Sequence, residues 1–100
     1  MNYLDVLKKE SGIFWKYFEA KYKLFYNSNL FLRDLQYAIQ RYFETKNVYI
    51  SYSQAETTAL EFVKELEKEG DLLRLDAHTW RVNFHIGSDK KEELVEEINE

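Results

Sequence analysis

The side chains that most often carry out chemistry are few in this chain of 100 residues. His78 and His85 are the only histidines, and cysteine is absent. Two histidines without cysteine do not make a zinc motif, because structural zinc sites draw four ligands from such residues. The lack of cysteine also excludes a disulfide framework, a thiol nucleophile and an iron–sulfur site. We therefore expect neither a metal site nor a cofactor.

The remaining candidates for catalysis are serines, carboxylates and glycines. The serines fit helix caps and turns, at positions 11, 28, 51, 53 and 88. Glutamates and lysines alternate over residues 61–68, a pattern typical of a solvated helix face with weak ion pairs. Three glycines and no proline leave no glycine-rich phosphate loop. We expect no enzyme and no small-molecule substrate.

Basic and aromatic residues are interleaved in the first half of the chain. Residues 1–50 hold eight basic and five acidic residues, whereas residues 51–100 hold six and thirteen. Lys9, Lys16 and Lys23 are seven residues apart, so one helix face would carry them about 10 Å from each other. Such a row can follow a phosphate backbone, with base edges read by Gln and Thr. If the chain binds DNA, the expected contacts are Lys16, Lys23, Gln54, Thr57, Thr58 and Arg81.

A heptad-like stripe of apolar residues runs through the N-terminal segment. Apolar side chains recur at alternating spacings of three and four, interrupted by Ser11 and Lys21. This pattern predicts one continuous helix over residues 3–26. Because such a stripe can pair with a second helix, we expect a homodimer interface formed by Leu7, Phe14, Phe18 and Phe25.

The remaining elements follow from caps, turns and alternation. Ser53 and Glu56 match a capping box, and Gly70 falls where a left-handed residue would end the helix. The expected elements are a turn at 27–29, a helix over 30–45, a strand over 48–52, a helix over 53–69, strands over 72–75 and 80–86 around a turn at 76–79, and a helix over 89–99. We expect the strand over 48–52 to pair with the strand over 80–86.

The chain contains 17 aromatic residues, which is more aromatic surface than a small monomer easily hides. Either the tyrosines are half-exposed, or the surplus serves a second copy, a partner or a ligand. The residues expected in the core are Leu7, Phe14, Phe18, Leu35, Ile39, Ile50, Phe62, Val63, Leu66, Leu73, Val82 and Phe84.

The second half of the chain resembles a winged-helix domain. The run over 59–73 looks like a recognition helix that passes through Glu69 and Gly70 into the first strand of a wing, and 81–84 looks like the returning strand. The resemblance covers 48–86 and departs from the family in having one helix, rather than two, between the first strand and the hairpin. The outward glutamates of 53–69 and a turn at 76–79 without Arg or Lys also differ from a DNA-contacting wing. The resemblance implies a winged-helix-like fold, and such domains often serve as protein docking platforms.

The sequence therefore predicts one α+β domain over 1–100. It consists of a helical hairpin (1–47), a winged-helix-like unit with a small three-stranded antiparallel sheet (48–86), and an acidic C-terminal helix (87–100). With neither an apolar run of about 20 residues nor a signal-peptide pattern, a cytoplasmic protein without membrane contact is expected. The expected function is that of a non-enzymatic accessory or regulatory protein that associates with itself or another protein. The alternative is a DNA-binding transcriptional regulator.

Overall fold

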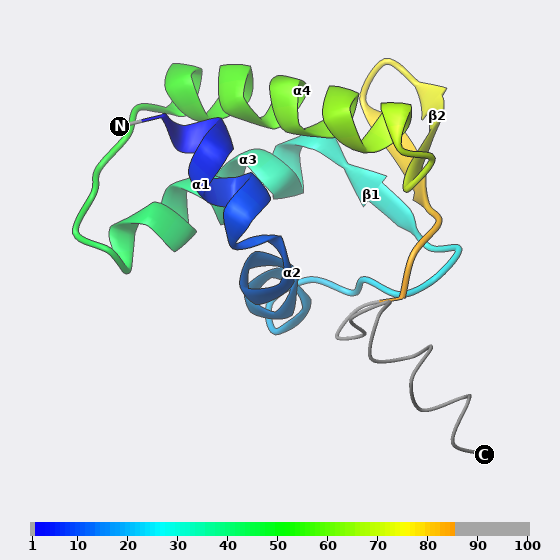
Figure 1. The fold of residues 1–100 in the computed structure, drawn as a ribbon, viewed down its shortest axis with the longest axis horizontal. Coiled ribbons are helices and arrows are strands. Elements are labelled where there is room, and N and C mark those ends of the chain that lie inside the picture. The colour runs from blue at the N-terminus through cyan, green and yellow to red at the C-terminus, as the bar shows by residue number, and fades with distance from the viewer. Residues whose placement is uncertain (1, 86–100) are drawn as a thin grey trace.

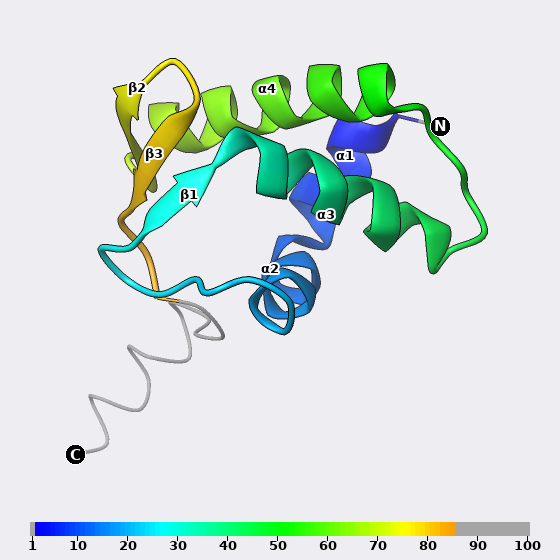
Figure 2. The ribbon, with the colours of Figure 1, turned by 180° about the vertical axis from the view of Figure 1, so that it is seen from behind.

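The computed structural model describes residues 2–85, which fold as helices followed by a β-hairpin, with one early strand inserted between the helices (Figure 1). This arrangement confirms the expected α+β class. The elements are α1 (Tyr3–Lys9), α2 (Ser11–Glu19), β1 (Asn29–Phe31), α3 (Leu32–Glu44), α4 (Tyr52–Lys68), β2 (Leu72–Asp76) and β3 (Thr79–Val82). The sheet lies at one end of the molecule, and the loop joining α3 to α4 lies at the other (Figures 1 and 2).

The single helix expected over 3–26 is wrong. The helical path bends at Glu10, which ends α1 and precedes α2, and α2 itself stops at Glu19. The side chain of Asn2 caps α1 by accepting a hydrogen bond of 3.1 Å from the backbone N–H of Asp5. The bend allows the two short helices to pack on different partners, α1 on α4 and α2 on α3. The apolar residues of the heptad-like stripe therefore pack against two different helices of the same chain, α4 and α3.

The first strand is β1, not the segment 48–52, in which no strand forms. Leu30 of β1 lies opposite Trp80 of β3, and both side chains are fully buried. In the loop that replaces the expected strand, the carbonyl of Ile50 accepts from the Gln40 side chain, and Ser51 caps α4. The backbone and side-chain groups of this segment therefore form hydrogen bonds with α3 and with the start of α4, not with β3. The expected pairing of 48–52 with 80–86 is therefore also wrong.

The sheet has the order β1-β3-β2 with antiparallel pairing throughout. The hairpin strands are close to those expected, although β3 ends at Val82. A bulge between Arg74 and Asp76 shifts the register of β2 against β3. The Asp76 carboxylate accepts a hydrogen bond of 2.8 Å from the backbone N–H of His78, which closes the turn. The expected helix over 89–99 lies outside the described residues.

The N-cap of α4 lies two residues before the expected one. Ser51, rather than Ser53, is the N-cap, and its hydroxyl accepts from the backbone N–H of Gln54 at 3.0 Å. The Gln54 side chain returns the contact by accepting from the Ser51 N–H at 2.9 Å. The end of α4 is as expected, because Gly70 has a φ of +82°.

The core lies between the helices and the inner face of the sheet, and its buried side chains form one cluster that extends through all described elements. Trp15 stacks on Phe62 with ring centroids 5.7 Å apart, joining α2 to α4. All residues expected in the core are buried except Leu73, which is exposed, and Phe84, which is half-buried. The exception at Leu73 arises because its neighbour Leu72 faces inward, opposite Val82.

Candidate interaction surface

The outer face of the sheet carries apolar side chains that no described element covers. Phe31 is 48% exposed and Leu73 is 47% exposed, and Arg81 lies on the strand between them. Leu75, two residues beyond Leu73 at the bulge, is 46% exposed. We call Phe31, Leu73, Leu75 and Arg81 the sheet face. Side chains alternate across a strand, so this face is the reverse of the buried one formed by Leu30, Leu72, Trp80 and Val82.

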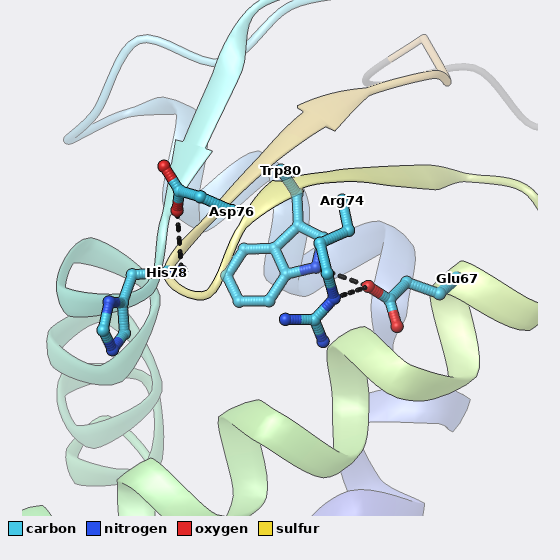
Figure 3. A network of polar contacts seen from close by, with 5 residues as sticks. All are labelled: Glu67, Arg74, Asp76, His78 and Trp80. Carbon is cyan, nitrogen blue, oxygen red and sulfur yellow. Dashed lines mark hydrogen bonds and ion pairs between the residues drawn. The ribbon is translucent and has the colours of Figure 1, made fainter.

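A polar network on the inner face fixes the hairpin to α4 (Figure 3). One carboxylate oxygen of Glu67 accepts from the indole N–H of Trp80 at 2.7 Å and from Nε of Arg74 at 2.9 Å. The Arg74 guanidinium lies over the Trp80 ring, 5.2 Å from its centroid. Because Trp80 is fully buried, its N–H needs this acceptor. The network therefore holds the inner face of the hairpin against α4.

A groove of about 580 Å³ adjoins the sheet face and shares Phe31 with it. The start of α3, the first turns of α4 and the hairpin turn form its walls. Leu32 N–H donates to the carbonyl oxygen of His78 at 2.9 Å, which ties the hairpin turn to the start of α3. We call this the Gln36 groove, and the residues that line it are Phe31, Leu32, Arg33, Asp34, Gln36, Tyr52, Glu56, His78 and Thr79.

Gln36 is the most unusual residue of the groove, because its polar side chain is only 3% exposed. Its carbonyl oxygen accepts from the Tyr52 hydroxyl at 2.6 Å. Its amide nitrogen has no hydrogen-bond partner among residues 2–85. Every side-chain nitrogen or oxygen that is closed off from solvent there does have a partner, so this nitrogen keeps some access to solvent, and Gln36 is one of the residues that line the groove.

The groove has no dominant charge. Arg33 supplies a guanidinium group and His78 an imidazole, while Asp34 and Glu56 supply carboxylates. At the hairpin turn beside the groove, hydrogen bonds from the His78 backbone and the Thr79 side chain hold the pKa of Asp76 below its usual value. Asp76 therefore adds negative charge close to the groove at neutral pH.

The residues expected to bind DNA lie on different elements of the fold. Lys16 lies on α2, Lys23 lies beyond its end, and Arg81 belongs to the sheet face. The other three residues are Gln54, Thr57 and Thr58, and the structure brings them together. They line a second groove of about 490 Å³ between the start of α1 and the start of α4. Thr58 is buried, and the Gln54 side chain already completes the capping box.

The dimer interface expected along the N-terminal helix is wrong for three of its four residues. Leu7, Phe14 and Phe18 are fully buried in the core of the same chain. The bend at Glu10 turns them toward α3 and α4 instead of toward a second copy. Phe25 alone is exposed, in the segment between α2 and β1.

Neither the Gln36 groove nor the sheet face was predicted from the sequence. The run Leu72 to Leu75 holds three leucines in four residues. Because side chains alternate between the two faces of a strand, these leucines indicated that at least one of them would lie on the exposed face. Gln36 gave no such signal, because a glutamine on a helix is ordinary.

Residues 2–85 contain no group of three His, Asp or Glu side chains that could hold a metal ion. None of the helices described there combines the length and apolar character needed to cross a bilayer. No family model, no curated protein and no solved structure matches the chain.

Proposed function

We propose that this chain is a winged-helix-like association module without enzymatic activity, and that it associates with a second copy of itself. The order of elements supports the resemblance. The first strand is β1, so two helices, α3 and α4, precede the hairpin, as the family pattern requires. The sequence had suggested only one helix between the first strand and the hairpin, because the first strand was wrongly placed at 48–52. An accessory or regulatory role in the cytoplasm belongs to the same proposal and is based on the sequence.

The observation that carries the proposal is the sheet face. Phe31 and Leu73 lie on opposite outer strands, and each remains nearly half-exposed after the chain has folded. Contiguous exposed apolar side chains with a polar rim are typical of protein interaction sites. Arg81 between them suits such a site, because Arg and aromatic residues are enriched at the centres of interfaces.

The oligomeric state of the full chain tests the proposal. Sedimentation velocity and light scattering should show a dimer whose population rises with protein concentration. Leu73→Asp should shift the equilibrium to the monomer, because it places a charge in an apolar contact. Ile13→Asp is the matched control, since Ile13 is an exposed apolar residue on α2, away from the sheet face. A wild-type chain that stays monomeric at every accessible concentration overturns the proposal. An equal loss of dimer in Leu73→Asp and Ile13→Asp overturns it as well.

DNA binding is the second candidate, and the same order of elements favours it because α4 would occupy the place of a recognition helix. The charges argue against it. Glu56 and Glu61 are exposed on α4, and the hairpin turn carries Asp76. Fluorescence anisotropy of a labelled duplex and of its single strand, at about 50 mM and 200 mM salt, decides the question. We expect no salt-dependent binding, whereas micromolar affinity that falls steeply with salt would establish phosphate contacts.

A further inference from the structure

The loop between α3 and α4 presents one side chain far into solvent. Tyr49 is 74% exposed, more than any other large hydrophobic residue in the described part of the chain. The loop stands away from the helices in both views of the fold (Figures 1 and 2). Its two flanks are held in place, because Val48 N–H donates to the Phe43 carbonyl at 2.9 Å and Gln40 donates to the Ile50 carbonyl at 3.2 Å. Tyr49 is thus displayed by an ordered loop.

The Gln36 groove offers what such a side chain needs. Phe31 and Tyr52 line the groove and are each about half-exposed, so a third aromatic ring can pack against them. The open amide nitrogen of Gln36 is a donor without an acceptor in residues 2–85. A phenol supplies an apolar ring together with an oxygen that accepts a hydrogen bond.

The charge of the groove selects against other occupants. A phosphate would meet Asp34 and Glu56 as well as Arg33, so its interaction energy would largely cancel. A neutral side chain that contributes an acceptor avoids this repulsion and still satisfies the amide of Gln36. Nucleic acid is therefore the less suitable occupant, and a tyrosine is the better one.

We propose that Tyr49 of a second copy inserts into the Gln36 groove, where its hydroxyl oxygen accepts a hydrogen bond from the amide nitrogen of Gln36. The inference rests on the self-association proposed above and names one contact of it. Each copy carries both halves of the contact, and Tyr49 lies three residues before Tyr52 of the groove wall. A twofold axis can therefore form the contact twice, as in an isologous dimer.

A double-mutant cycle on the full chain tests the contact, with the dimer dissociation constant from sedimentation equilibrium as the readout. Tyr49→Ser should weaken the dimer at least tenfold. Tyr49→Phe and Gln36→Leu should each weaken it about threefold to tenfold, the range expected for one hydrogen bond. The double variant should be no weaker than the worse single variant, because both changes remove the same bond. Tyr26→Phe, which removes an exposed hydroxyl away from the groove, should leave the dissociation constant unchanged.

The outcomes separate this inference from the proposed function. If the chain dimerises and Leu73→Asp disrupts the dimer while Tyr49→Ser does not, self-association stands and the Tyr49 contact is wrong. If Tyr49→Phe and Gln36→Leu act additively, the hydrogen bond is wrong. A chain that is always monomeric overturns both. Thermal melts of each variant show whether a loss of association reflects unfolding. If Gln36→Leu does not fold, Tyr49→Phe still tests the hydrogen bond, because Tyr49 is exposed.

Discussion

The hydroxyl of Tyr42 donates a hydrogen bond of 2.6 Å to the carboxylate of Glu10, and this contact joins α3 to the bend between α1 and α2. The ammonium group of Lys46 lies 2.9 Å from the same carboxylate oxygen and 5.3 Å from the centroid of the Tyr42 ring. Hydrogen bonds from Lys46 and Tyr42 lower the pKa of Glu10. Burial and the bond to Glu10 raise the pKa of Tyr42 well above its usual value. The three residues stabilise the bend that turns the N-terminal helices around the core.

Tyr42→Phe removes the donor but keeps the ring, which packs edge-on against Phe14 at 5.3 Å. We expect the free energy of unfolding to fall by about 1–3 kcal/mol, since the lost hydrogen bond has a charged acceptor. Urea unfolding followed by circular dichroism measures the change. Tyr26→Phe, at an exposed position, should change the value by less than about 0.5 kcal/mol. Equal effects of the two substitutions would show that the contact does not stabilise the bend.

The pH dependence of stability should report on Glu10. Its pKa is lower in the folded chain than the usual 4.5, so the folded state favours the ionised form. The stability that it contributes is present above pH 4.5 and is lost as the pH falls through the folded pKa. Glu10→Gln should therefore be less stable than the wild type at pH 7, and the difference should shrink toward pH 3. A difference that is constant with pH would contradict this assignment.

Glu67 is expected to stabilise the hairpin through the indole of Trp80. Glu67→Ala leaves the buried Trp80 N–H without its acceptor, so we expect a loss of about 1–3 kcal/mol in the free energy of unfolding. Glu67→Gln retains an acceptor oxygen and should lose less. Glu61→Ala, which changes an exposed residue of the same helix, serves as the control in the same urea titrations. If Glu61→Ala costs as much as Glu67→Ala, the loss belongs to the helix and not to the network.

Two glycines should respond in opposite directions to alanine. Gly70 has a φ of +82°, which L residues rarely adopt, so Gly70→Ala should destabilise the chain by about 1–2 kcal/mol. Gly12 lies in α2 with an ordinary φ, and nothing lies within 4 Å of an added Cβ. Gly12→Ala should therefore stabilise the chain by about 0.4–1 kcal/mol. The midpoints of thermal unfolding, compared for both variants under the same conditions, test the pair, and a shift in the same direction for both contradicts the argument.

Local sequence signals were sufficient for several elements because each depends on neighbours in the chain. The end of α4 at Gly70 requires only a left-handed residue, and the hairpin requires only two apolar runs around a polar turn. The start of α4 could also be placed within two residues, although Ser51 and Ser53 both had a suitable partner three residues on. These features, together with the α+β class and most of the core, were determined by the sequence alone.

Contacts between distant residues decided the rest. The sequence predicted a strand around Ile50 and a helix from residue 30 onward, but the pairing of Leu30 with Trp80 makes Asn29–Phe31 the strand. The inward turn of Leu72 instead of Leu73 depends on the register against β3, because a shift by one residue exchanges the two faces. The bend at Glu10 depends on Tyr42, which is 32 residues away. The sheet face and the Gln36 groove follow from these choices, since periodicity specifies that one face is buried but not which partner buries it.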